Sequence, residues 1–112
     1  MPVLKNATKA IIDDRKIRDY ILNMRNPDGR HKARVIRAAT GLARLNYNDL
    51  IEQIKQGILA SEAEPIDAIP YGERFRVVIT ISGPKGTLRV RTGWIYRIGE
   101  DVPRLATLYP LP

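Results

Sequence analysis

The chain has 112 residues, of which 44% are hydrophobic and 28% charged, with one His and no Cys. This length and composition predict a single globular domain over 1–112, and they exclude disulfides, a cysteine nucleophile and any site that needs two histidines. Nineteen Lys and Arg face 12 Asp and Glu, and the excess positive charge lies in residues 1–44 and 71–112, so a surface built from both ends would attract a polyanion.

Three helices are predicted in the first half of the chain, at about 13–24, 30–43 and 49–63. In each of them apolar residues recur at spacings of three and four, as one buried helical stripe requires. The stripes are Ile17, Tyr20, Ile21 and Met24; Val35, Ile36, Ala39 and Leu42; and Leu50, Ile51, Ile54, Ile58 and Leu59. The turn sequence 26–29 separates the first two helices, and Gly41 is expected to end the second.

Strands are predicted in the second half. Residues 74–82 and 87–97 alternate between apolar and polar side chains and are joined by a turn at 83–86. A short extended segment lies between Pro65 and Pro70, and in a last strand Leu105, Thr107 and Tyr109 alternate onto one face. The predicted fold is α+β, with about three N-terminal helices packed on a C-terminal antiparallel meander sheet of three to four strands.

A candidate phosphate site lies at the start of the second helix. Backbone N–H groups at a helix N-terminus bind anions, and Arg30, Lys32 and Arg34 add positive charge there, with Arg37 one turn further on. His31 lies among them, and the usual pKa of a histidine suits proton transfer near neutral pH. In the alternative interpretation these are solvated charges on a helix surface.

The predicted strands carry further candidates. Thr92 and Thr107 lie on faces that are otherwise apolar, so each hydroxyl either points into a cleft and orients a phosphate or is satisfied by nearby backbone. Trp94 and Tyr109 either stack on bases or pack the helices against the sheet. Arg91 either binds a phosphate or belongs to a solvated sheet face.

No metal or cofactor is expected, because no acidic cluster has the spacing of metal ligands and no glycine-rich loop is long enough to cradle a nucleotide. No apolar run approaches the roughly 18 residues of a membrane span, and the N-terminus lacks the apolar core of a signal peptide. We therefore expect a cytoplasmic protein that makes no membrane contact.

Five segments carry a resemblance that covers nearly the whole chain. They are RDYILN (18–23), GRHKARV (29–35), YGERF (71–75), RTGWI (91–95) and PRLATLY (103–109). In this order they resemble an uncharacterised bacterial domain family whose members occur as small stand-alone proteins and as C-terminal domains of secreted polymorphic toxins. The order of helices and strands is also similar to that of the barnase/EndoU/colicin/RelE-like group of metal-independent ribonucleases.

The resemblance implies RNA cleavage by attack of a ribose 2′-OH on the adjacent phosphate, without a metal. His31 would then be the general acid or base, and Lys32, Arg34 and Arg91 would hold the phosphate. Thr92 and Thr107 would orient the phosphate. With a single His, the second proton-transfer role would fall to a Lys, a Tyr or water.

The sequence is therefore compatible with three functions. The first is a ribonuclease toxin that an acidic antitoxin or immunity protein holds inactive. The second is a non-catalytic basic module that binds nucleic acid or an acidic protein, and the third is a structural domain whose charges serve only solvation. The first requires His31, the second requires the arginines alone, and the third predicts no affinity for RNA. The sequence indicates no oligomeric state.

Overall fold

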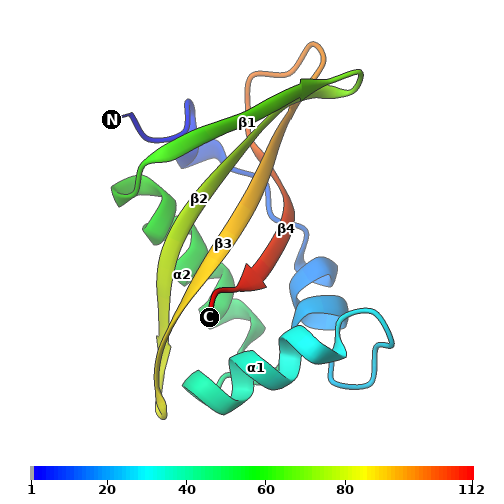
Figure 1. The fold of residues 1–112 in the computed structure, drawn as a ribbon, viewed down its shortest axis with the longest axis vertical. Helices are drawn as coiled ribbons and strands as arrows, with labels where there is room; N and C mark the ends of the chain where they lie inside the picture. The colour runs from blue at the N-terminus through cyan, green and yellow to red at the C-terminus, as the bar shows by residue number, and fades with distance from the viewer. Residues whose placement is uncertain (1) are drawn as a thin grey trace.

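The structure, a computed structural model, describes residues 2–112 and places three helices before a four-stranded antiparallel sheet (Figure 1). The strand order in the sheet is β1-β2-β3-β4, so each strand pairs with its neighbour in the sequence. The predicted α+β class and the predicted meander are confirmed. The helices are η2 (Lys16–Ile21), α1 (Arg30–Thr40) and α2 (Tyr47–Ala60), with short 3₁₀ turns η1 (Ala7–Lys9) and η3 (Arg44–Asn46). The strands are β1 (Ala63–Ile69), β2 (Gly72–Gly83), β3 (Gly86–Arg97) and β4 (Arg104–Pro110).

The first helix is shorter than the sequence pattern predicts. It is a π-helix that ends at Ile21, where the N–H of Leu22 donates to the carbonyl of Ile17, 2.9 Å away. The wider π turn moves the next apolar position away from the expected spacing. As a result Leu22 is buried and Met24, predicted to be in the stripe, is 39% exposed.

The second and third helices match their predictions more closely. α1 ends at Gly41, whose φ of 84° is in the left-handed region that glycine adopts without strain. α2 buries Leu50, Ile51 and Ile54 together with Ile58, whereas Leu59 is 40% exposed.

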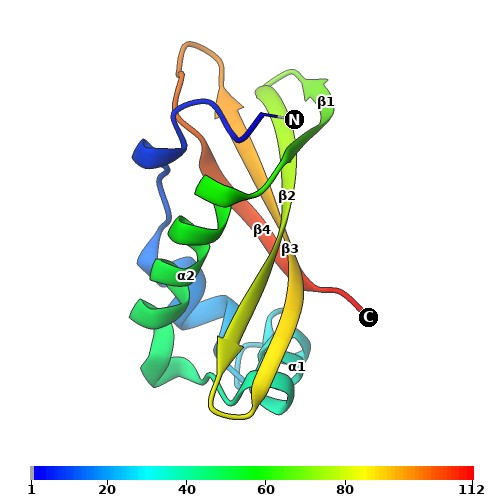
Figure 2. The ribbon, with the colours of Figure 1, turned by 90° about the vertical axis from the view of Figure 1, so that its left-hand side faces the viewer.

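α2 lies along one face of the sheet and α1 lies at its lower end beside β3 and β4, so the other face is left open (Figures 1 and 2). Alternate residues of the long β2–β3 hairpin point toward the helices, as predicted. The buried ones are Val77, Ile79 and Ile81 on β2 and Val90, Thr92 and Trp94 on β3. α2 approaches β2 closely, because a Cβ at Gly57 would lie only 2.9 Å from the Cγ2 of Ile79. The open face therefore carries the opposite set of side chains, many of them arginines.

A bulge interrupts the pairing of β4 with β3. Gly93 pairs with Thr107 but Trp94 pairs with Leu105, so Ala106 is an extra residue on β4. The extra residue reverses the alternation after Leu105, and Leu108 instead of Thr107 is buried. The prediction that Leu105, Thr107 and Tyr109 share one face is therefore wrong.

The outer edge of β4 is partly covered by the N-terminal segment. The N–H of Ile11 donates to the carbonyl of Pro103 at 2.9 Å, and the N–H of Leu105 donates to the carbonyl of Ile11 at 3.0 Å. This bridge protects the first part of the edge strand. Within residues 2–112, none of the helices combines the length and the apolar character that crossing a membrane requires.

Candidate functional site

Three of the sequence-predicted residues meet on the open face of the sheet. Arg91 on β3 pairs directly with Tyr109 on β4, and Gly93 pairs with Thr107. Both Thr107 and Tyr109 are exposed, because the bulge at Ala106 turns them away from the core. The last two strands thus bring a guanidinium, a hydroxyl and a phenol ring onto one surface, which we call the β4 site.

The residues of the β4 site line a hollow of about 260 Å³ on the open face of the sheet, which we call the arginine hollow. Its lining residues are Ile66, Arg74, Phe75, Arg76, Arg91, Gly93, Trp94, Ala106, Thr107 and Tyr109. A Cβ at Gly93 would lie 2.5 Å from the Oγ1 of Thr107, so the glycine allows this hydroxyl to lie close against β3. The hollow therefore presents three guanidinium groups beside a hydroxyl that the glycine accommodates.

Two of these three arginines are neutralised by carboxylates of β1. Arg74 donates to Asp67 at 2.6 and 2.7 Å, and Arg76 lies 3.0 Å from Glu64. The hydrogen bonds from Arg74 lower the pKa of the Asp67 carboxyl. Both pairs remain partly solvated, so each fixes the position of its arginine more than it stabilises the fold.

Arg91 differs from the other two arginines of the hollow. Its Nε is buried, yet within residues 2–112 this atom donates no hydrogen bond, and the side chain forms no ion pair. A buried donor without an acceptor costs about 1–3 kcal/mol, and a charged donor costs more. The guanidinium of Arg91 is thus the group in the hollow with unused capacity to bind an anion.

A second hollow of about 540 Å³, the lysine hollow, lies on the other side of β4. Its lining residues are Asp13, Arg15, Lys16, Tyr20, Ile21, Lys32, Ala106, Thr107 and Leu108. Ala106 and Thr107 therefore line both hollows, which meet at the bulge. The Nζ of Lys16 donates to the carbonyl of Ala106 at 2.9 Å and holds η2 against the bulge.

Lys32 lies between two aromatic rings in the lysine hollow. Its Nζ is 5.3 Å from the ring centre of Tyr20 and 5.4 Å from that of Tyr109, which are cation–π distances. Burial lowers the pKa of the Lys32 ammonium, and the positive charge of Lys16 lowers it further. Lys32, a predicted phosphate contact, thus lies against Tyr109 of the β4 site. Its neighbours on α1 do not lie there.

The expectation that Thr92 and Thr107 share a cleft is wrong. Thr92 is fully buried on the helix side of the sheet, and its hydroxyl donates to the carbonyl of Val77 at 2.7 Å. Trp94, a candidate for base stacking, is 1% exposed and donates to the Thr92 hydroxyl at 2.8 Å. Both side chains belong to the core, and the Thr92 hydroxyl and the Trp94 N–H already have hydrogen-bond partners there.

Part of the predicted anion site at the start of α1 is occupied by Asn26. The side-chain oxygen of Asn26 accepts hydrogen bonds from the N–H groups of Asp28 and Gly29, and its carbonyl accepts from the N–H of Arg30. These contacts satisfy donors that an anion would otherwise use.

The remaining α1 candidates project into solvent. They are Arg30, His31, Arg34 and Arg37, all exposed, and none lines either hollow. The Nη1 of Arg37 lies 3.5 Å from the sulfur of Met24. The structure therefore does not bring His31 together with Arg91 or Thr107.

Sequence reasoning missed Lys16, Arg74 and Arg76 as members of this surface. Arg74 and Arg76 alternate onto the open face in the sequence pattern, but nothing in the sequence shows that β4 brings a hollow beside them. Gly93 carried a usable signal, because a glycine inside a strand often marks a bulge or a close approach. Among residues 2–112, no three His, Asp or Glu side chains gather where they could hold a metal ion.

The sequence of the chain matches a known protein family. A family model described as a domain of unknown function (DUF6883) matches residues 3–112, which is nearly the full length. A search of the curated proteins finds no match.

Proposed function

The chain belongs to the DUF6883 family, whose description assigns no activity, and from the geometry of the β4 site we propose that it binds single-stranded RNA through the phosphates. The observation that carries this proposal is the buried and unpartnered Nε of Arg91. A guanidinium binds a phosphate with two parallel hydrogen bonds, which would satisfy this donor.

The two hollows favour a chain of phosphates over one small anion. They meet at Thr107, so consecutive phosphates of one strand can enter the arginine hollow and the lysine hollow in turn. Lys16 and Lys32 supply positive charge in the second hollow, and the 39% exposed ring of Tyr109 lies between the two. Such alternation of cations and an aromatic ring is typical of single-strand binding.

Fluorescence anisotropy with a labelled single-stranded oligouridine, in EDTA and over a range of NaCl concentrations, tests the proposal. We expect Arg91→Met to weaken binding several-fold and to reduce the salt slope by about 0.7, the value for one phosphate contact on a single strand. Lys55→Met is the matched control, because Lys55 is exposed on α2, on the opposite side of the sheet. Equal loss in both variants would mean that net charge alone attracts the RNA.

A second candidate function, RNA cleavage, is favoured by one observation. Lys32 lies beside Tyr20 and Tyr109 in the lysine hollow, and burial together with the charge of Lys16 lowers the pKa of its ammonium. We propose that neutral Lys32 removes the proton of a ribose 2′-OH, whose oxygen then bonds to the phosphorus. The bond to the 5′-oxygen breaks, and this oxygen takes a proton from the Lys16 ammonium, which leaves a 2′,3′-cyclic phosphate and a 5′-hydroxyl.

Gel analysis of the same RNA samples separates cleavage from binding. If Lys32 is the base, Lys32→Gln abolishes the cyclic-phosphate product, whereas His31→Ala leaves it unchanged. Loss of product only with His31→Ala would restore the histidine mechanism. RNA binding without product in the wild-type protein would leave a binding module.

Under this second candidate function, the protein is a ribonuclease toxin that acts in the cytoplasm. An acidic antitoxin or immunity protein that covers the β4 site would then restrain it. Expression of the wild-type chain would be toxic, and expression of Lys32→Gln would not.

A further inference from the structure

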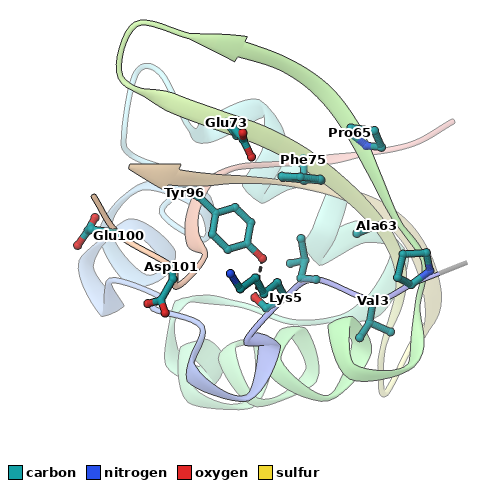
Figure 3. Close-up of a pocket in the computed structure, with 11 residues that line it drawn as sticks. Val3, Lys5, Ala63, Pro65, Glu73, Phe75, Tyr96, Glu100 and Asp101 are labelled. Atoms are coloured by element: carbon teal, nitrogen blue, oxygen red, sulfur yellow. Dashed lines mark hydrogen bonds between the residues drawn. The ribbon is translucent and has the colours of Figure 1, made fainter. Parts of the chain in front are cut away.

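A third hollow, of about 530 Å³, lies between the N-terminal segment and the sheet (Figure 3). Along this hollow the N–H of Ala63 donates to the carbonyl of Pro2 at 3.1 Å, and the hydroxyl of Tyr96 donates to the carbonyl of Lys5 at 2.6 Å. The hollow occupies the space between these hydrogen bonds. We call it the N-terminal hollow.

The inner surface of the N-terminal hollow is apolar and aromatic. Phe75 and Tyr96 lie edge to face with ring centres 5.4 Å apart, and Val3 and Pro65 add aliphatic surface. In Figure 3 the two rings are seen beside each other above the N-terminal segment. A cavity of this size and character suits a small ligand with an apolar body.

Negative charge gathers at the rim of this hollow, in a chain with a net charge of +7. Three carboxylates line it, from Glu73, Glu100 and Asp101, against a single Lys5. Arg104 holds Glu100 through two hydrogen bonds of 2.9 and 3.2 Å. Within residues 2–112, the carboxylates of Glu73 and Asp101 form no ion pair, so their charge remains available to a ligand.

We propose that the N-terminal hollow binds a small organic cation: an amine attached to an aromatic or aliphatic body. The body fills the apolar space beside Phe75 and Tyr96, and the ammonium group lies at the rim, attracted by Glu73 and Asp101. Aromatic rings add to this attraction, because their faces are electron-rich. Phosphate groups, which the β4 site favours, are repelled here.

This site does not depend on RNA binding. The N-terminal hollow shares one lining residue, Phe75, with the arginine hollow and none with the lysine hollow. Amine binding is therefore measured without RNA, and its failure leaves the proposed function untouched.

Three probes of similar shape and different charge test the proposal: phenethylamine, 2-phenylethanol and 3-phenylpropanoate. Each is titrated into isotopically labelled protein while the NMR signals of Val3, Ala63 and Tyr96 are followed. We expect phenethylamine to shift these signals and to bind about fivefold more tightly than the alcohol, whereas the carboxylate does not bind.

The double variant Glu73→Gln/Asp101→Asn removes the charge with little change in shape, and it should bind the amine no better than the alcohol. Glu52→Gln is the control, because Glu52 is exposed on α2 outside the hollow. An unchanged amide spectrum in the unliganded variant shows that its fold is intact. Equal affinity of the wild-type protein for amine and alcohol, or no shift at millimolar amine, would overturn the proposal.

Discussion

The indole Nε1 of Trp94 donates a 2.8 Å hydrogen bond to the hydroxyl of Thr92, two residues earlier on the same strand. That hydroxyl donates in turn to the carbonyl of Val77 on β2 at 2.7 Å. All three groups are within the core, where an unpaired polar atom is costly. Thr92 therefore provides the hydrogen-bond acceptor for the buried indole N–H of Trp94, the largest core residue.

Thr92→Val should lower the free energy of unfolding by about 1–3 kcal/mol, because it leaves the Trp94 N–H without an acceptor at almost constant volume. Urea unfolding followed by circular dichroism measures this change. Thr107→Val is the matched control: Thr107 is exposed, so its stability should change by less than about 0.5 kcal/mol. Similar losses in both variants would contradict the structural role given to Thr92.

Arg91→Met should behave in the opposite way, weakening RNA binding without destabilising the fold. The substitution removes the buried and unpartnered Nε and keeps an aliphatic stem in place. We expect the free energy of unfolding to stay within about 1 kcal/mol of the wild type or to rise. Denaturant unfolding checks this expectation. A decrease of several kcal/mol in the free energy of unfolding would show that Arg91 stabilises the fold and is not a free anion-binding group.

Gly93→Ala should obstruct the arginine hollow. The added Cβ would lie 2.5 Å from the Oγ1 of Thr107, so that hydroxyl must move. We expect weaker RNA binding in the anisotropy measurement. The double variant Gly93→Ala/Thr107→Ala removes the clash, so its stability should exceed that of Gly93→Ala. Unaltered RNA affinity in Gly93→Ala would place the RNA elsewhere.

Asp19 should contribute an acid-dependent part of the stability. Arg18 and Arg44 donate to its carboxylate, Arg44 at 2.7 Å, and these hydrogen bonds lower the pKa of Asp19 from 3.8 to about 2. Because the pKa is lower in the folded protein, the contribution is present above pH 3.8 and disappears as the pH falls through about 2.

Asp19→Asn should therefore lower the melting temperature at neutral pH and reduce its fall between pH 3.8 and about 2. Thermal unfolding across this range measures both effects. Asp28→Asn serves for comparison, since among residues 2–112 no cation pairs with the Asp28 carboxylate. An identical pH profile for Asp19→Asn and the wild type would rule out this role.

The regular parts of the fold were predictable because their signals are periodic. The stripe from Leu50 to Ile58 and the alternation of Val77 with Ile79 each report which side of an element is buried. The exceptions occurred where the backbone departs from the regular period: at the π turn closed by Leu22 and at the bulge at Ala106. No side-chain pattern in a single sequence marks the π turn, and the bulge is indicated only indirectly, by Gly93 on the neighbouring strand.

The candidate site was predicted in part for the same reason. Arg91, Tyr109 and Lys32 were identified as basic or aromatic candidates, and the fold does bring them near one another. For Thr92 and Trp94 the core alternative holds and the ligand-binding alternative is wrong. A hydroxyl or an indole in a strand looks the same in sequence whether it faces a ligand or the core. Lys16 is part of the site through a contact across 90 residues, which local spacing does not reveal.

The bulge at Ala106 accommodates one extra residue in β4 while Thr107 stays paired with Gly93 and points outward. Deleting that one residue would leave Leu105, Thr107 and Leu108 in simple alternation, with Thr107 still outward and both leucines inward. The deletion would, however, remove the carbonyl that holds Lys16 against the strand. A single inserted residue thus connects the sheet to η2, because it supplies the carbonyl that Lys16 binds while the strand on either side keeps its alternation.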